Sequence, residues 1–340
     1  MKAPAFWTVS EGREAAPVVR ALLSPLAALY AWAGARRLRS TRPQELSVPV
    51  ICVGNLTLGG TGKTPVVQAL MRRLSALGAQ PFALSRGYGG REKGPLQVDP
   101  VHQDAGDVGD EPLLLAQAGP VVISRDRPAG GALAAGEGAS VIVMDDGHQN
   151  PSLAKALSIL VIDGQTGWGN GRVFPAGPLR EPVEPGLARA DAAIVMMPDE
   201  DSEPDYRALG LDEVEYPVLR AWLKPSAPPP GGALIAFAGI GRPEKFYDAL
   251  TAAGGEIIDT VSFGDHHAFS EGELKYLFAL AARHGASLVT TEKDWVRLPV
   301  HARERIAAWP VEAVFAQPDV LDALLQRVVD ASDESAKPLA

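Results

Sequence analysis

Cysteine, histidine and basic residues are all scarce in this sequence, and each shortage excludes a class of protein. Cys52 is the single cysteine, so no internal disulfide can form, and its apolar neighbours suit a buried side chain in a reducing compartment. Six histidines without a Cys/His cluster argue against a zinc site. The formal net charge of −9 is opposite to the balance of nucleic-acid-binding proteins, so we expect no nucleic-acid partner.

The N-terminus lacks a secretory signal and also lacks an apolar run that matches a bilayer in length. The uncharged stretch 21–35 (ALLSPLAALYAWAGA) reaches about 22 Å as a helix, whereas the hydrocarbon core is roughly 30 Å thick. Arg20 and Arg36 bound this stretch, and Tyr30 and Trp32 suit the headgroup region. We therefore expect a helix that lies in, or dips into, the membrane interface. The alternative is a terminal helix packed on the protein's own core.

Apolar residues, in contrast, make up 46% of the 340 residues, enough for two domains of ordinary size. Strand-like and helix-like stretches alternate after Pro43, which predicts a parallel sheet covered on both faces. The segment 225–232 (PSAPPPGG) can be neither helix nor central strand, and the alternation restarts after it. We therefore predict an N-terminal membrane-associated helix (1–44), a first α/β domain (45–224), a smaller α/β domain (225–330) ending in a strand–helix pair (311–329), and a frayed tail (331–340).

The segment Gly59-Gly60-Thr61-Gly62-Lys63-Thr64 lies between a β-rich run and the amphipathic stretch 63–77, which is the context of a phosphate-binding loop. Glycines let backbone N–H groups face phosphate oxygens, and the helix N-terminus adds a partial positive charge. We expect Lys63 to reach the β/γ-phosphates of ATP and the Thr64 hydroxyl to bind Mg²⁺. Thr57 stands where the first glycine is usual, and a purely structural glycine turn is the alternative. The predicted first domain is therefore a P-loop NTPase-like parallel sheet.

Carboxylates follow in two places. Asp145 and Asp146 come directly after the apolar run 140–144, at the strand end where parallel sheets bind ligands, and are candidate Mg²⁺ ligands. The alternative is an aspartate that merely ends a strand in a turn. Asp110 and Glu111 open a helix-like stretch, where Asp110 is either an ordinary N-cap or a group that accepts the proton of an acceptor hydroxyl.

A phosphate loop with a metal carboxylate fits an ATPase, a GTPase switch or a kinase. The nearest candidate for guanine recognition, 290–294 (TTEKD), has its Lys and Asp adjacent instead of spaced by one, so we do not interpret it as a base-recognition motif. The cluster 263–267 (FGDHH) follows a strand of the second domain and could reach across an interdomain cleft; the alternative is a strand-end turn. These residues alone leave the kinase and the nucleotide-dependent switch both open.

Taken together, these segments resemble the tetraacyldisaccharide 4′-kinase family. No later segment is specific alone, but their order over residues 50–298 matches that family. The resemblance rests on the following segments: Val53–Pro65, Ser85–Gly90, Val108–Pro112, Asp145–Gln149, Pro175–Glu181, Phe237–Gly241, Phe263–His267 and Thr290–Asp294.

The resemblance implies a reaction, in which ATP phosphorylates the 4′-hydroxyl of an acylated glucosamine disaccharide 1-phosphate to give a lipid IVA type of product. It implies that Asp110 is the general base with His266 as its partner across the cleft. It implies work at the cytoplasmic face of the bacterial inner membrane, and we expect a monomer. It assigns Asp145, Asp146 and Glu111 to the Mg²⁺–ATP region. It also implies that Arg180 and Glu181 lie near phosphate or metal, where Arg180 could stabilise charge on the transferring group.

Two positions test the match. Thr57 belongs to the family's pattern, so it ceases to be an anomaly. His148 replaces a residue that is usually apolar in the family, which puts the packing behind the aspartate pair in question. The rival hypothesis is a P-loop switch or metal-cofactor chaperone with no phosphorylated acceptor, which gives no reason for the apolar N-terminal helix.

Overall fold

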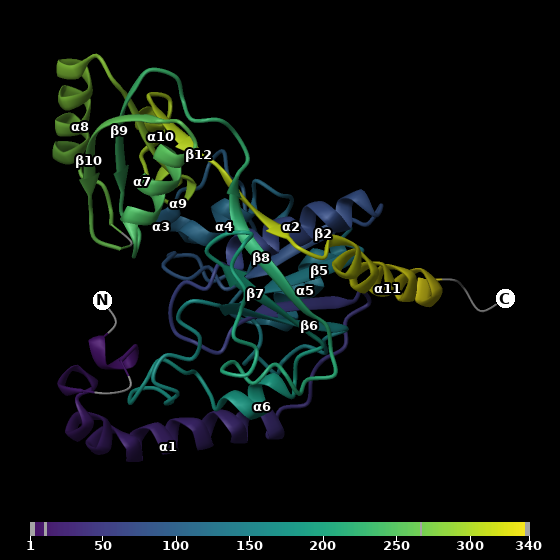
Figure 1. Ribbon diagram of the computed structural model, residues 1–340. Helices are drawn as coiled ribbons and strands as arrows, with labels where there is room; N and C mark the ends of the chain where they lie inside the picture. The colour runs from purple at the N-terminus through teal and green to yellow at the C-terminus, as the bar shows by residue number, and fades with distance from the viewer. Residues whose placement is uncertain (1–3, 10–11, 266, 337–340) are drawn as a thin grey trace.

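The structure, a computed structural model, describes residues 4–9, 12–265 and 267–336. Two α/β units lie one above the other, and a long helix lies beneath the larger unit (Figure 1). Strand β8 (Val218–Pro225) leads from the larger unit into the smaller one, and β13 (Val311–Phe315) leads back. The predicted α/β class with two units and an N-terminal helix is confirmed.

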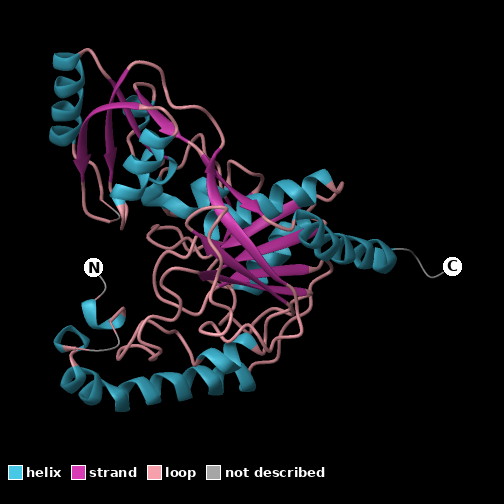
Figure 2. Ribbon diagram, in the orientation of Figure 1, coloured by secondary structure: helices cyan, strands magenta, loops and turns pink. Residues whose placement is uncertain are grey.

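The larger unit contains a nine-stranded sheet in the order β13-β8-β7-β6-β1-β5-β2-β4-β3. Its strands are drawn in magenta, with helices in cyan around them, in Figure 2. Its pairings are parallel except at the two edges, where β3 and β13 run antiparallel to their neighbours. Besides β8 and β13, its strands are β1 (Val50–Gly54), β2 (Pro81–Ser85), β3 (Leu96–Gln97), β4 (Val121–Ile123), β5 (Val141–Asp145), β6 (Leu157–Asp163) and β7 (Ala192–Met197).

Helices cover both faces of this sheet, as the continuous apolar runs of its strands require. Ile51 and Val53 of β1 face the helices α2 (Lys63–Ala76), α4 (Asp110–Leu115) and α11 (Pro318–Ala336). Val50 and Cys52 face the opposite side, towards α5 (Arg127–Gly136). The short helices α3 (Ala105–Val108) and α6 (Val183–Leu187) complete this unit.

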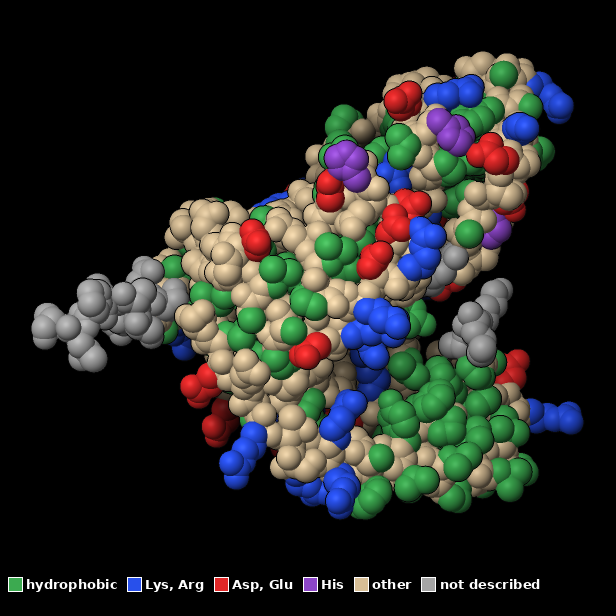
Figure 3. All heavy atoms as spheres, turned by 180° about the vertical axis from the view of Figure 1, so that it is seen from behind, with side chains coloured by type: hydrophobic (Ala, Val, Ile, Leu, Met, Phe, Trp, Pro, Cys, Tyr) green, Lys and Arg blue, Asp and Glu red, His purple; other side chains and the backbone are tan. Residues whose placement is uncertain are grey.

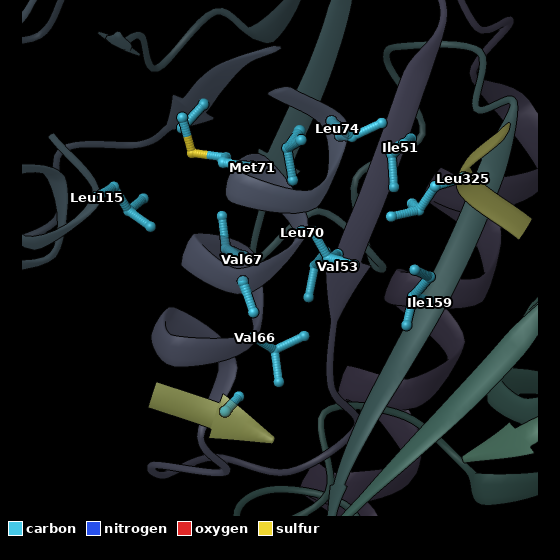
Figure 4. Packing of buried hydrophobic residues seen from close by; sticks show 14 of the residues in the cluster. Ile51, Val53, Val66, Val67, Leu70, Met71, Leu74, Leu115, Ile159 and Leu325 are labelled. Carbon is cyan, nitrogen blue, oxygen red and sulfur yellow. The ribbon is translucent and has the colours of Figure 1, made fainter. Parts of the chain in front are cut away.

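The stripe of α2 predicted from the sequence is the centre of the main core. Val66, Val67, Leu70 and Leu74 are fully buried in one cluster with β1 and α11, and Figure 4 shows Leu70 next to Val53 of β1 and Leu325 of α11 near Ile51. Burial of each such side chain contributes about 1.5–3 kcal/mol relative to exposure. This packing fixes the start of α2, and with it the loop that precedes the helix.

The prediction that the last strand–helix pair belongs to the smaller unit is wrong. β13 pairs antiparallel with β8 in the nine-stranded sheet, and α11 packs in the same core as α2. The chain therefore crosses between the units twice. Helix α11 also continues to Ala336, so the expected frayed tail does not begin at residue 331.

The smaller unit has a parallel four-stranded sheet in the order β10-β9-β11-β12. Phe237 and Leu277 lie in one of its two cores, which together cover both faces of β9. The strands are β9 (Ala233–Ala238), β10 (Glu256–Ser262), β11 (Ser287–Thr291) and β12 (Ile306–Trp309), and the helices are α7 (Pro243–Ala252), α8 (Glu271–His284), α9 (Glu292–Trp295) and α10 (Val300–Arg303).

Helix α1 (Pro17–Ser40) follows short 3₁₀ turns at Ala5–Trp7 and Arg13–Ala15 and is longer than predicted. Its 24 residues reach about 36 Å because the helix continues through the arginines that bound the uncharged stretch. Segment Arg13–Ser40 is long and apolar enough to cross a membrane, and only 6% of its most apolar window is buried. Ala27 alone is buried among the residues of α1, which contradicts the alternative of a helix packed on the core.

Candidate active site

The phosphate loop connects the central strand β1 to α2, as its sequence predicts. Gly59 and Gly62 have φ values of 127° and 82°, in the left-handed region that glycine adopts without strain. Gly62 is the N-cap of α2, so Lys63 and Thr64 form its first turn. The buried Asn55 amide donates hydrogen bonds to the Thr57 carbonyl (2.8 Å) and to Thr61 Oγ1 (3.3 Å). The loop is therefore held in shape by the residue that follows β1.

Asp145 and Asp146 lie where β5 ends beside β1, because Asp145 is in register with Val53. Asp145 is buried, and among the described residues its Oδ1 has no hydrogen-bond partner. Burial raises the pKa of this carboxyl to about 7, and the Glu111 charge adds to the shift while Lys63 opposes it. An unpaired buried carboxylate oxygen at this place is a favourable ligand for a cation.

Asp146 is held by two cations. Its backbone adopts φ 52°, and its carboxylate accepts hydrogen bonds from one Arg180 nitrogen to both oxygens at 2.8 Å. Lys63 Nζ lies 3.5 Å from Asp146 Oδ1. Burial alone would raise the pKa of this carboxyl, but Lys63 and Arg180 together hold it below its ordinary value. Lys63, the predicted phosphate-binding residue, thus forms an ion pair with Asp146, a predicted metal ligand.

Arg180 reaches Asp146 because its segment runs beside the phosphate loop. The Arg180 amide donates to the Leu56 carbonyl and the Leu58 amide donates to the Pro178 carbonyl, both at 2.7 Å. Arg180 Nε also donates to the Thr57 carbonyl at 3.2 Å. These long-range contacts place a cation at the loop, where the resemblance predicted it.

Glu181 is turned away from this position. Both of its carboxylate oxygens accept hydrogen bonds from Arg189 at 2.7 Å, and Gln149 donates to Oε1 at 2.9 Å. Gln149 donates in turn to the Asn55 carbonyl at 2.9 Å. In this ion pair Glu181 supports the loop, and its place at the metal stays a prediction.

Asp110 and Glu111 begin α4. The helix starts at Asp110 with Gly109 as its N-cap, so the expectation of Asp110 as the N-cap is off by one residue. Burial raises the pKa of the Glu111 carboxyl, with Lys63 opposing and the charges of Asp110 and Asp146 adding to the shift. Glu111 is therefore close enough to the loop lysine and to Asp146 for their charges to shift its pKa.

His266 lies outside the described residues. Its neighbour His267 stacks on Phe263 at 4.8 Å between ring centroids, and its Nε2 lies 2.9 Å from Glu273 at the start of α8. Asp294 of segment 290–294 is fully buried and accepts from the Gly239 amide at 2.9 Å. This segment is therefore part of the smaller unit's framework.

His148 fits its position as a neutral buried side chain. Its Nε2 donates to the Gly186 carbonyl at 2.9 Å, and its Nδ1 accepts from Ser158 Oγ at 3.3 Å. Burial lowers the pKa of His148 to about 4, and the charges of Arg189 and Lys155 add to the shift. The packing behind the aspartates is intact, with a hydrogen-bonded imidazole at this position.

Arg127 was missed in the sequence. It is buried at the start of α5, and its guanidinium donates to the Asp145 carbonyl at 3.0 Å and to the Ser124 carbonyl at 3.4 Å. Burial lowers its pKa, whereas the charges of Asp145 and Asp146 raise it. Arg127 comes four residues after β4 ends, at the first position of α5, and only the fold shows that it faces the aspartate pair.

Within the described ranges, no three His, Cys, Asp or Glu side chains form a ready-made metal cage. Nucleotide sites do not need one, because Mg²⁺ there uses one or two carboxylates together with phosphate oxygens and water. The parallel sheet, the glycine loop after its central strand and the aspartates on the neighbouring strand define a P-loop nucleotide-binding protein.

The chain belongs to the LpxK family, described as tetraacyldisaccharide-1-P 4′-kinase, whose family model matches residues 19–330. Curated tetraacyldisaccharide 4′-kinases of Maricaulis maris and Hyphomonas neptunium are 61% and 53% identical to it, over 97% and 96% of this chain and 97% of each relative. The crystal structure of LpxK from Aquifex aeolicus in complex with ATP matches with a TM-score of 0.73 and 28% identity, covering 92% of this chain and 99% of that one. The chain is therefore an ATP-dependent kinase, and the switch hypothesis is not favoured.

Proposed function

We propose that this chain transfers the γ-phosphoryl group of ATP to the 4′-hydroxyl of a tetraacyldisaccharide 1-phosphate. The names of its relatives support the acceptor, and the complex of the Aquifex aeolicus protein with ATP supports the nucleotide. The observation that carries the proposal is that Lys63 and Arg180 both form ion pairs with Asp146, so that two cations lie beside the phosphate loop. Phosphoryl transfer depends on positioned cations of this kind more than on covalent chemistry.

Residues 59–64 are proposed to bind the triphosphate. Backbone N–H groups of the loop and the N-terminus of α2 suit the phosphate oxygens, and Lys63 projects from the first turn of that helix. Arg180 is placed to stabilise the charge that develops on the transferring group.

Thr64, Asp145 and Asp146 are proposed to hold Mg²⁺, with Glu111 near them. The unpaired Oδ1 of the buried Asp145 fits a hard cation that prefers oxygen ligands. When bound, Mg²⁺ would neutralise charge on the β- and γ-phosphates. Burial and the Glu111 charge raise the pKa of Asp145, and a bound cation would instead favour the charged form of this carboxyl.

Asp110 is proposed to accept the proton of the 4′-hydroxyl, with His266 as its partner. Its carboxylate contacts Arg297 of the smaller unit, so it lies at the junction of the two units.

The chain is proposed to have three parts. They are an N-terminal helical segment (1–44), a larger unit (45–224 with 311–336) and a smaller unit (225–310).

Helix α1 is proposed to place the enzyme on the cytoplasmic face of the inner membrane. Leu22 is 73% exposed, and Leu26, Leu29 and Trp32 are also exposed, so an apolar surface covers this end of the molecule (Figure 3). Arginines in the last turn suit anionic lipid. Such a surface would bring the active site to an acceptor that resides in the bilayer.

The acceptor is tested by ³¹P NMR of the lipid after incubation with the protein, ATP and Mg²⁺. The proposal predicts a second phosphomonoester, attached at the 4′ position of the disaccharide. A lipid that keeps its 1-phosphate alone while ATP is hydrolysed would refute the proposed acceptor.

A further inference from the structure

Arg297, which follows α9 in the smaller unit, connects that unit to the start of α4 in the larger one. Its Nε donates to Asp110 Oδ2 at 3.0 Å, and a second guanidinium nitrogen of Arg297 is in contact with the same oxygen. Its remaining nitrogen donates to the Gly239 carbonyl at 3.2 Å and to Asp294 Oδ1 at 3.1 Å. One guanidinium therefore binds the proposed base on one side and the smaller unit on the other.

This network is buried, unlike an ordinary surface ion pair. The side chains of Arg297 and Asp110 are 7% and 10% exposed, and that of Asp294 is fully buried. Buried charges are tolerated when their hydrogen bonds are satisfied, and the planar fork of arginine can satisfy several acceptors in fixed directions. The arrangement constrains the direction of the Asp110 carboxylate, which a solvated pair would leave free.

Arg297 is itself held from the smaller unit. Asp294 Oδ2 accepts from the Gly239 amide at 2.9 Å and from Thr291 Oγ1 at 2.8 Å, so the partner of Arg297 cannot turn away. The orientation of Asp110 thus depends on how the smaller unit sits against the larger one.

A second contact between the units does not touch Asp110. Arg242, at the N-cap of α7, binds Asp163 at the end of β6 at 3.0 Å, and its side chain is 48% exposed. Loss of this contact removes one interaction between the units but leaves the surroundings of Asp110 unchanged. A variant at Arg242 therefore distinguishes an effect on docking from an effect on the proposed base.

We propose that Arg297 is a positioning residue for phosphoryl transfer. It aims the Asp110 carboxylate at the acceptor hydroxyl, and it does so only while the two units are docked. This inference rests on the proposed function, in which Asp110 accepts the proton. Misplacement of a reacting group by about 1 Å can cost roughly 10²-fold in rate, which sets the expected effect.

The test measures kcat and KM for the acceptor, together with the Kd for ATP, in the full-length protein. Arg297→Gln should lower kcat by about 10²-fold and leave the Kd for ATP within about threefold. Arg297→Lys, which keeps the charge and loses the fork, should recover part of that loss. Arg242→Gln is the matched control and should cost less than about threefold. Equal losses of kcat in Arg297→Gln and Arg242→Gln would overturn the inference. If Arg297→Gln does not fold, Arg297→Lys is compared with Arg242→Gln in its place.

The decisive comparison is the double variant. If Arg297 acts through Asp110, Arg297→Gln should cost nothing further in an Asp110→Asn protein, whereas independent structural damage would multiply. An additive loss would overturn the inference. Near-normal turnover of Asp110→Asn alone would instead refute the proposed base. An inactive Asp110→Asn beside a normal Arg297→Gln would leave the proposed function standing and remove only the positioning role.

Discussion

The buried imidazole of His148 should make the protein sensitive to mild acid, and His148→Gln should remove much of that sensitivity. The imidazole lies between the Gly186 carbonyl and the Ser158 hydroxyl, and it must be neutral to accept from Ser158. Protonation would place a charge among Arg189 and Lys155 in a buried site. The glutamine amide keeps a donor and an acceptor but cannot take up a proton in this range.

The magnitude follows from the pKa of His148, which burial lowers from 6.5 to about 4 in the folded state. Because the unfolded chain binds the proton first, the free energy of unfolding falls as pH drops from about 6.5 and levels off below about 4. The full difference is roughly 3 kcal/mol. Asp145 acts in the opposite direction, since its pKa is raised to about 7 when folded, so wild type must be compared with the variant at each pH.

The assay is urea unfolding in detergent between pH 7.5 and pH 4, followed by tryptophan fluorescence. At pH 7.5 the variant should lose on the order of 1 kcal/mol for its altered hydrogen bonds. At lower pH the difference should shrink and then reverse. His284→Gln, the same change on the surface, should follow the wild-type curve. A difference in the free energy of unfolding between wild type and His148→Gln that does not vary with pH would show that His148 is not the source of the acid sensitivity.

Three further predictions concern the loop, the metal and the membrane. A Cβ at Gly54 would lie 2.5 Å from the Cβ and 2.8 Å from the backbone nitrogen of His148. Gly54→Ala should therefore lower the free energy of unfolding by about 1–3 kcal/mol in urea titrations. Gly136→Ala, which meets nothing within 4 Å, should not destabilise the protein. Asp145→Asn should raise the Mg²⁺ concentration for half-maximal activity by about tenfold or more, and an unchanged titration would remove Asp145 from the metal site. Leu22→Lys with Leu26→Lys should abolish flotation with anionic vesicles, and continued flotation would remove α1 from the membrane contact.

Local features of this protein were predictable from sequence, because they depend on neighbouring residues. The strand–glycine loop–helix unit and the burial of Leu70 follow from periodicity and composition. The aspartates after β5 follow from the rule that parallel strands present their carboxyl ends at one edge.

Features that depend on distant contacts were not predictable in this way. A strand such as Val311–Phe315 has the same pattern in either sheet, and only its pairing with β8 returns it to the larger unit. The contact of Arg297 with Asp110 joins residues 187 positions apart, and the segment that carries Arg297 has no pattern that names its partner. The ion pair between Glu181 and Arg189 is a further example, since the sequence does not reveal that Arg189 binds both oxygens of Glu181.

The most direct measurement of the central claim is the transfer of label from γ-labelled ATP into the disaccharide 1-phosphate lipid by detergent-solubilised protein with Mg²⁺. We expect label to enter the lipid at a rate set by the acceptor concentration. We also expect Lys63→Ala to abolish the transfer, since Lys63 is the cation that joins the phosphate loop to Asp146. Release of labelled phosphate with none in the lipid, by folded protein that binds ATP, would contradict the central claim.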